Sequence, residues 1–222
     1  MRSLRDVALA NRLFGGRRAV LAEVRRVLHG AHAARAQTTD GTEPLTVLDI
    51  GTGLGDIPRA AQQMAARTGM PLTTIGVELV PALARTAGAA CTYALAADAM
   101  ALPFPDDSID IVTCSQVLHH FDGPEADRLL QECTRVAKSA VIIGDLRRSW
   151  LAVAGLWAAS FLLGFHPVSR HDGVVSILRG FTPSELQALV ARATGCAVRT
   201  RRAPGFRVVA VWSPHRASSG PA

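Results

Sequence analysis

Short apolar runs separated by helical patterns fill the chain from residue 45 to residue 145. The run "LTVLDI" (45–50) is typical of a parallel strand that is covered on both faces. Four more strand-like runs follow: "LTTIGVE" (72–78), "CTYALAA" (91–97), "IDIVTCS" (109–115) and "SAVIIGD" (139–145). Helical patterns lie between them, over residues 56–67 and 124–136 and in a short segment that begins at Pro81. Strands that alternate with helices predict βαβ units and a mostly parallel sheet.

The pattern is different after residue 180. The segment "TPSE" (182–185) combines an N-cap threonine, a proline at the first helical position and a capping-box glutamate, and predicts a helix that runs to Gly195. Two strand-like runs, "AVRTR" (197–201) and "FRVVAVW" (206–212), then flank a turn that is too short for a helical crossover. They are predicted to form an antiparallel hairpin, which completes an α/β fold with a seven-stranded, mostly parallel sheet and helices on both faces.

The N-terminal region has a helical pattern of its own. Residues 3–29 predict two helices broken at Gly15 and Gly16, and residues 30–44, rich in Ala, Thr, Gln and Gly, predict a linker. We therefore expect an N-terminal helical cap and linker over 1–44, a main domain over 45–213 with an apolar helical insertion at 146–180, and a flexible tail over 214–222.

The most apolar stretch is "SWLAVAGLWAASFLLGF" (149–165), which has no charged side chain. A helix of this length spans about 26 Å, short of the ~20 residues that a bilayer core requires, and the strands on either side belong to one sheet. We therefore expect no membrane span. Three roles stay open: a lid over an active site, packing on the N-terminal helices or in a homodimer seam, and shallow contact with a membrane surface through tryptophans and nearby arginines.

As a lid, this stretch would bind a hydrophobic small molecule together with the residues that follow it. Its apolar lining would come from Trp150, Leu156, Trp157, Phe161 and Phe165. Polar groups that orient the small molecule would come from His166, Arg170 and His171.

Charge and cysteine content narrow the function classes. The net charge of +6 is almost entirely due to arginine, which clusters in residues 1–30 and 199–207. Neither cluster has the interleaved aromatic residues that stack on bases, so solvated helix faces are favoured over a nucleic-acid partner. The four scattered cysteines predict free thiols and no metal site. Because the N-terminus lacks the apolar core of a secretory signal, we expect a cytoplasmic protein.

Candidate chemistry lies at the end of the first predicted strand. The loop "GTGLG" (51–55) joins that strand to a helix, and its glycines let a ligand approach the backbone. Glu78 ends the next strand, where dinucleotide folds place the acid that holds ribose hydroxyls. The spacing G-x-G-x-G differs from the pyrophosphate fingerprint, and no G-K-[ST] is present for a triphosphate. These features predict a nucleoside ligand without a phosphate cradle, a description that S-adenosylmethionine fits.

Several segments together carry a resemblance to a known family. "VLDIGTGLGDIP", "IGVEL", "AADAMALPFPDDSIDIVTCSQVLHHF" and "RGFTPSELQAL" resemble motifs of the class I, Rossmann-like S-adenosylmethionine-dependent methyltransferases, over about residues 45 to 212. The middle segment is most similar to the branch of ubiquinone and menaquinone C-methyltransferases and small-molecule O-methyltransferases. The resemblance implies cofactor-binding roles for Asp49, Gly51, Gly53, Glu78, Leu79, Asp98, Ala99 and Gln116.

A histidine pair follows the fourth predicted strand. A hydroxyl nucleophile loses a proton during methyl transfer, and an imidazole is suited to accept it. His119 or His120 is therefore a candidate general base, although packing alone would also explain the pair. The chain lacks the [ND]-P-P-[YF] stretch of enzymes that methylate nucleic-acid amino groups. We expect methyl transfer to a hydroxyl or activated carbon of a hydrophobic aromatic, quinone or polyketide-like molecule; the alternative is a non-catalytic cofactor-binding scaffold.

Overall fold

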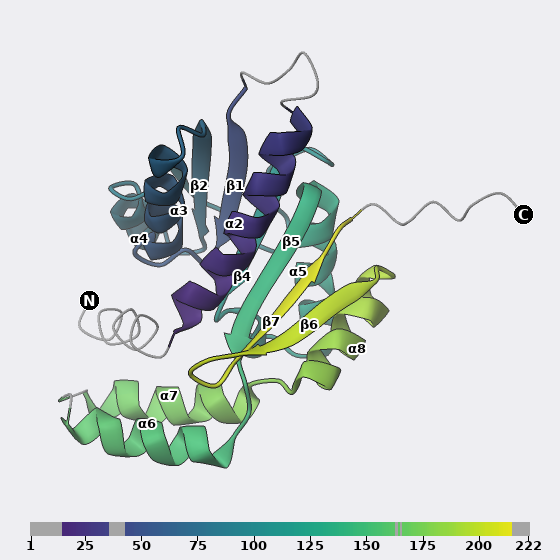
Figure 1. The fold of residues 1–222 in the computed structure, drawn as a ribbon. Helices are drawn as coiled ribbons and strands as arrows, with labels where there is room; N and C mark the ends of the chain where they lie inside the picture. Colours follow the sequence, from purple (N-terminus) through teal and green to yellow (C-terminus); the bar gives the residue numbers. More distant parts are fainter. Residues whose placement is uncertain (1–14, 36–42, 163, 165, 215–222) are drawn as a thin grey trace, which may run out of the picture.

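Seven strands form one mixed sheet in the computed structural model, which describes residues 15–35, 43–162, 164 and 166–214 (Figure 1). The strands are β1 (Leu45–Ile50), β2 (Leu72–Glu78), β3 (Tyr93–Ala96), β4 (Ile109–Ser115), β5 (Ala137–Leu146), β6 (Val198–Ala203) and β7 (Arg207–Trp212). Their order is β3-β2-β1-β4-β5-β7-β6. Strands β1 to β5 are parallel, whereas β7 pairs antiparallel with both β5 and β6. The predicted fold class is confirmed, including the C-terminal hairpin.

Helices cover both faces of the sheet. On one face, α2 (Gly16–Arg35) and α3 (Asp56–Arg67) pack against apolar strand residues such as Val47 and Ile142. On the other face, α5 (Gly123–Val136) and α8 (Pro183–Thr194) pack against residues such as Leu48 and Ile143. The short helix α4 (Pro81–Ala87) packs against β2 and β3. Because alternate residues of each strand enter opposite cores, the central strands are buried on both faces, as their continuous apolar runs predict.

The helix α8 begins as its sequence predicts. Thr182 accepts a hydrogen bond from the Glu185 backbone N–H, and the Glu185 side chain accepts one from the Thr182 backbone N–H. This capping box satisfies two N–H groups that the first turn leaves without helical partners. Gly195 ends the helix in the left-handed conformation that glycine adopts without strain.

The N-terminal helix is longer than predicted. Helix α2 continues past Gly30 to Arg35, so a linker that starts at residue 30 is wrong. One glycine costs a helix about 1 kcal/mol relative to alanine, and the alanine-rich segment 31–34 together with the preceding packed turns outweighs that cost. Residues 3–14, 36–42 and 215–222, which the sequence assigns to a first helix, a linker and a tail, lie outside the described residues.

A buried carboxylate joins α2 to the C-terminal hairpin. Glu23 is fully buried and pairs with Arg26 on its own helix and with Arg199 and Arg201 on β6. Burial raises the pKa of Glu23, but the hydrogen bonds and charges of Arg201 and Arg199 outweigh it and hold the pKa below its ordinary value. Arginines from the N-terminal cluster and from the C-terminal cluster therefore pair with the same carboxylate, that of Glu23.

The apolar insertion forms a helical hairpin beyond the carboxyl edge of the parallel strands. Helices α6 (Trp150–Leu162) and α7 (Pro167–Arg179) pack against each other at the lower end of the molecule in Figure 1. At Gly173 a Cβ would come within 2.7 Å of Leu156 Cδ2, so a larger residue there would have to displace the end of the Leu156 side chain. Of the roles left open for this stretch, packing on the N-terminal helices does not hold for α2, because α2 lies on the sheet and against α3. No helix in the described part of the chain is both long and apolar enough to cross a bilayer.

Candidate functional site

The glycine loop after β1 combines a crowded position with an open one. Gly51 and Gly53 have φ angles of 64° and 59°, a region that L side chains rarely adopt. A Cβ at Gly51 would lie 2.4 Å from Val117 Cγ2, whereas nothing lies within 4 Å of the position a Cβ would take at Gly53. The Gly53 N–H donates to Glu78 Oε1 at 2.6 Å. The predicted loop and the predicted strand-end acid are therefore in direct contact.

Asp49 lies at the base of this loop and is almost fully buried. The Thr113 hydroxyl of β4 donates to Asp49 Oδ1 at 2.6 Å. Burial raises the pKa of Asp49 to about 7; the Thr113 hydrogen bond opposes this rise, and the nearby carboxylates of Asp56 and Glu78 add to it. Near neutral pH this group is therefore poised between its charged and neutral forms, and a nearby cation would favour the carboxylate.

The remaining predicted cofactor residues lie at or just beyond neighbouring strand ends. Leu79, next to Glu78, has 71% of its surface exposed. Asp98 is exposed after β3, and its Oδ1 accepts the Met100 backbone N–H at 2.8 Å. Ala99, which follows Asp98 in the sequence, is half-buried and lies at the start of the segment that leads to β4. Because parallel strands end at the same edge of a sheet, these residues and the glycine loop line one edge.

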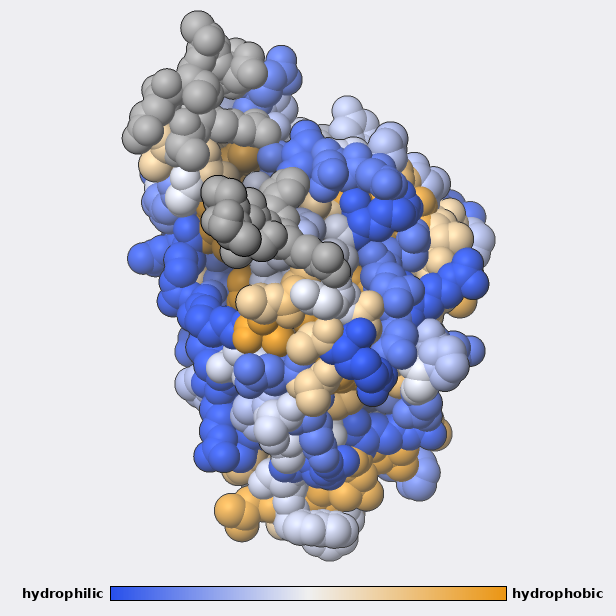
Figure 2. Space-filling view, turned by 90° about the vertical axis from the view of Figure 1, so that its right-hand side faces the viewer, coloured by the Kyte–Doolittle hydropathy of each residue, from blue (hydrophilic) through white to orange (hydrophobic). Residues whose placement is uncertain are grey.

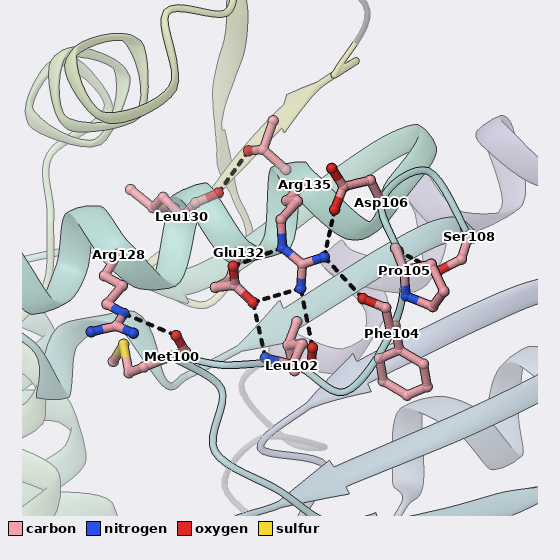
Figure 3. Close-up of polar contacts among 11 residues, drawn as sticks. Met100, Leu102, Phe104, Pro105, Asp106, Ser108, Arg128, Leu130, Glu132 and Arg135 are labelled. Atoms are coloured by element: carbon pink, nitrogen blue, oxygen red, sulfur yellow. Dashed lines mark hydrogen bonds and ion pairs between the residues drawn. The ribbon is translucent and has the colours of Figure 1, made fainter.

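Arg135 fixes the segment that follows Asp98. Its guanidinium donates to the carbonyls of Leu102 and Phe104 at 3.1 and 2.9 Å and to Asp106 at 2.7 Å. Glu132 accepts from Arg135 through both carboxylate oxygens and also from the Leu102 N–H at 2.9 Å (Figure 3). The segment has no regular secondary structure and therefore lacks the backbone hydrogen bonds of a helix or strand. The side-chain hydrogen bonds from α5 hold it in their place.

A second segment after β4 carries Gln116 and the histidines. Gln116 has a φ of 57°, which is strained for a side chain other than glycine, and its N–H donates to the Gly144 carbonyl at 2.8 Å. The short helix η1 (Leu118–His120) follows directly. A strained residue at this point turns the chain away from β4 and brings the two histidines over the end of β5.

His119 and Asp145 form a buried pair. The His119 Nδ1 lies 2.7 Å from Asp145 Oδ1, and the His119 backbone N–H donates to Asp145 Oδ2 at 3.1 Å. Both side chains are almost completely buried. The second ring nitrogen, Nε2, is buried without a hydrogen-bond partner among the described residues. A carboxylate on Nδ1 favours the tautomer in which Nε2 carries the lone pair, so this nitrogen is arranged to accept a proton.

His120 occupies a different environment from His119. Its ring centroid lies 4.2 Å from that of His119, and its side chain is exposed. Burial of part of the ring, together with the charges of His119 and Arg179, lowers the pKa of His120 despite the opposing charge of Asp145. His120 is therefore neutral at pH 7 but lacks a carboxylate that would orient its ring.

The expected substrate-binding residues belong to the helical hairpin, whereas His119 and His120 belong to η1. Trp150, Trp157 and Phe161 are exposed on α6, and the Trp157 and Phe161 rings meet edge to face at 4.8 Å. The Arg170 guanidinium stacks 3.6 Å from the Phe161 centroid. The remaining two predicted polar residues, both exposed, are His166, which caps α7, and His171. The structure thus brings Phe161 into contact with both Trp157 and Arg170. The role of the predicted residues as substrate lining stays a prediction, and Phe165 lies outside the described residues.

Sequence patterns did not identify Asp145, Thr113 or Arg135 as functional. Asp145 is the last charged residue of an apolar strand, a position at the ligand-binding edge that is itself a usable indication. Thr113 contacts a residue that is 64 positions away in the sequence, and Arg135 contacts residues about 30 positions away. Periodicity does not predict such contacts. Among the described residues, no group of three or more His, Cys, Asp or Glu side chains is placed to hold a metal ion.

Comparison with known proteins gives a consistent result. Residues 48–143 match the family described as a methyltransferase domain. The chain is 30% identical over 170 residues to a ubiquinone biosynthesis O-methyltransferase of Cupriavidus pinatubonensis, covering 72% of this chain and 64% of that protein. It is 32% identical to the protein of the same name from Paraburkholderia xenovorans, covering 75% of this chain and 72% of the relative.

A solved structure agrees with the fold. A SAM-dependent methyltransferase from Aquifex aeolicus superposes with a TM-score of 0.56 at 18% identity, covering 76% of this chain and 81% of that one. The chain spans less than two thirds of the length of the Cupriavidus relative. At 18% identity the likeness to the Aquifex structure shows a shared fold.

Proposed function

The chain belongs to the class I S-adenosylmethionine-dependent methyltransferases, and from that premise we propose that it transfers a methyl group to a hydroxyl of a hydrophobic aromatic, quinone or polyketide-like small molecule. The cofactor is S-adenosylmethionine, which supplies an electrophilic methyl group on a sulfonium centre. The observation that carries the choice of a hydroxyl is the His119–Asp145 pair, because a hydroxyl loses its proton when its oxygen is methylated and a histidine held by a carboxylate can accept that proton.

The edge of the sheet fits this cofactor. Glu78, already held by the Gly53 N–H, presents its second carboxylate oxygen toward ribose hydroxyls in the proposed arrangement. The open space at Gly53 admits the ligand close to the backbone, and a side chain there would occupy it. Asp49 would attract the methionine ammonium, and the exposed Leu79 and Asp98 would contact the adenine.

His119 is proposed as the general base and Asp145 as the residue that positions it. In this arrangement the proton of the acceptor hydroxyl would pass to His119 Nε2 as the oxygen takes up the methyl group. The methyl–sulfur bond would break with its electron pair staying on sulfur, which leaves S-adenosylhomocysteine. The Asp145 carboxylate stabilises the imidazolium that results. His120 is the weaker candidate, because no described group fixes its ring against a reacting atom.

The hydrophobic acceptor is supported by two observations. The relatives from Cupriavidus and Paraburkholderia are named for ubiquinone biosynthesis. In addition, α7 packs against η1, so the apolar hairpin lies next to the proposed base. An apolar hairpin next to the proposed base favours an acceptor with an aromatic or long-chain body.

The His119 hypothesis is tested with His119→Gln, Asp145→Asn and the matched control His120→Gln. Tritiated methyl transfer from S-adenosylmethionine is followed with a panel of alkyl-tailed phenols and dihydroxyphenols. His119→Gln is expected to lower kcat by about 10²- to 10⁴-fold, with a smaller loss for nitro-substituted phenols, which ionise without help. Asp145→Asn is also expected to lower kcat, whereas His120→Gln should keep most of the wild-type kcat.

The cofactor dissociation constant separates chemistry from folding in this test. It should be the same in wild type and in all three variants, because neither histidine nor Asp145 is proposed to bind the cofactor. Full activity of His119→Gln at every pH tested would show that His119 is not the base. A loss confined to His120→Gln would move the role to His120.

A further inference from the structure

The solvent-facing side of α6 is entirely apolar. Within residues 150–161, every residue with an exposed side chain or backbone is Trp, Leu, Ala, Gly or Phe: Trp150, Leu151, Ala154, Gly155, Trp157, Ala158 and Phe161. The largest members are far from buried, with exposures of 78% for Trp150, 76% for Leu151, 56% for Trp157 and 52% for Phe161. Soluble helices normally present charged or polar residues on this side, so the pattern indicates a surface that is covered when the protein works.

Packing within the described chain does not account for this face. The opposite side of α6 already meets α7 through Ala152, Val153 and Leu156. Figure 2 shows hydrophobic residues gathered at the lower end of the molecule, which is the end that α6 and α7 occupy in Figure 1. The face is thus at an extremity of the protein, where a broad flat partner can reach it without contacting the sheet.

The charges of the helical hairpin and the residues that flank it are mostly positive. Residues 146–180 contain one acidic residue, Asp172, and four arginines, a net charge of +3. These are Arg147, Arg148, Arg170 and Arg179. Arg148 pairs with Glu185 of α8, while Arg147 stacks over Phe206 and Arg170 over Phe161, so both long side chains run along apolar surface. Tryptophans next to arginines that lie along apolar surface are typical of a membrane interface.

We propose that the α6–α7 hairpin docks on the surface of an anionic lipid bilayer, with α6 lying in the plane of the interface. The 13 residues of α6 extend about 20 Å, which suits a helix that lies on a membrane and not one that spans it. Trp150, Trp157 and Phe161 enter the boundary between headgroups and acyl chains, and the arginines meet lipid phosphates.

A second copy of the chain is a less suitable occupant. A two-fold interface through α6 would bring two identical hairpins together, each with the net charge of +3 given above. Such like-charge juxtaposition opposes association, whereas the same charge attracts anionic lipid. Bilayer contact therefore satisfies both the apolar face and its charged border.

Docking would also bring the proposed active site to the membrane. Because α7 packs against η1, His119 and His120 lie on the side of the molecule that carries the hairpin. An acceptor dissolved in the bilayer would then reach the site without crossing bulk water. This consequence rests on the proposed function, but the docking itself does not, because lipid binding requires neither cofactor nor acceptor.

Vesicle binding by the full chain tests the proposal. Co-sedimentation is compared with phosphatidylcholine vesicles and with vesicles that contain phosphatidylglycerol, at low and high salt. We expect binding to the anionic vesicles that weakens with salt. Tryptophan emission should shift to the blue and be quenched by brominated lipid, because Trp150 and Trp157 are exposed in the free protein whereas Trp212 is buried. In the variant Trp157→Phe, Trp150 is the only exposed tryptophan, so the change in emission reports on Trp150.

The double variant Trp150→Glu/Trp157→Glu supplies the decisive comparison. Both positions are exposed, so the far-ultraviolet circular dichroism and melting temperature should stay close to wild type, and the partition coefficient should fall at least about tenfold. Tyr93→Glu is the matched control, since Tyr93 is 64% exposed on the edge strand β3 and should leave vesicle binding unchanged.

Three results would overturn the proposal. One is wild-type protein that stays in the supernatant with anionic vesicles. Another is a folded double variant that binds as well as wild type. The third is light scattering that shows a stable dimer which the double variant dissociates, since α6 would then be covered by a second copy. Loss of methyl transfer without loss of vesicle binding would bear on the proposed function alone.

Discussion

Asp49 shows how one buried residue can link cofactor binding to pH. Its pKa is about 7 in the folded protein against 3.8 ordinarily, because burial disfavours the charged form. The unfolded chain loses this proton near pH 3.8 and the folded chain only near pH 7. The contribution of Asp49 to stability therefore falls as the pH rises between these two values and is constant above the higher one. A cation bound beside Asp49 would offset this cost, because it favours the carboxylate.

The affinity for S-adenosylhomocysteine should consequently depend on pH. This ligand keeps the ammonium group but lacks the sulfonium charge, so it isolates the proposed contact with Asp49. Binding should release a proton below the pKa of Asp49. The dissociation constant should be about tenfold higher at pH 6 than at pH 8 and should level off at about pH 8. Calorimetry from pH 5.5 to 8.5 measures this. Asp49→Asn is expected to bind more weakly with a nearly flat profile; a wild-type profile that is flat, or a variant with the same slope as wild type, would contradict the role.

Among the elements, the segment between β3 and β4 depends most on long-range side-chain contacts. Arg135 and Glu132 hold its backbone from α5, and Arg128 adds a hydrogen bond from its Nε to the Met100 carbonyl at 3.0 Å (Figure 3). The segment begins with Asp98, which is proposed to contact the adenine. A change in α5 should therefore alter cofactor affinity without touching the cofactor.

Arg135→Ala tests this connection. The substitution leaves the carbonyls of Leu102 and Phe104 without their charged donor, which should lower the free energy of unfolding by about 1–3 kcal/mol and weaken S-adenosylhomocysteine binding several-fold. Arg192→Ala is the control, because Arg192 pairs with Asp127 on the surface and does not contact the segment. The control should cost less than about 1 kcal/mol and leave binding unchanged. Urea unfolding and calorimetry check both; equal behaviour of the two variants would refute the role of Arg135.

The strands show what sequence patterns capture. The predicted bounds of β1, β2 and β4 match the structure, because continuous apolar runs with clear boundaries are buried on both faces. β3 is shorter than its predicted run 91–97, since the Thr92 and Thr74 side chains exchange hydrogen bonds with each other's backbone N–H where the ladder would begin. The glycine loop and Glu78 are expected at one edge because parallel strands end there. The roles of Asp49, Leu79, Asp98, Ala99 and Gln116 come from the resemblance to the methyltransferase family. The His119–Asp145 pair was only half predicted, because it joins residues 26 positions apart on different elements.

On the scale of the whole molecule, the sheet edge, the histidine pair and the apolar hairpin face the same end of the protein (Figure 1). Sequence patterns placed the hairpin correctly in the chain, after the fifth strand, but periodicity could not show that its apolar residues face outward, because α6 is apolar on every side. That exposure depends on where α2 lies, and α2 packs on the sheet through Val20 and Val24.

Methyl transfer from this chain to the hydroxyl of a hydrophobic acceptor can be measured in one assay. The full chain is incubated with methyl-tritiated S-adenosylmethionine and with organic extracts of candidate phenols, quinols and polyketides, and labelled products are separated. We expect a labelled, organic-soluble O-methyl product that His119→Gln fails to form. Tight binding of the cofactor with no labelled product from any fraction would contradict the proposed function and favour a non-catalytic cofactor-binding protein.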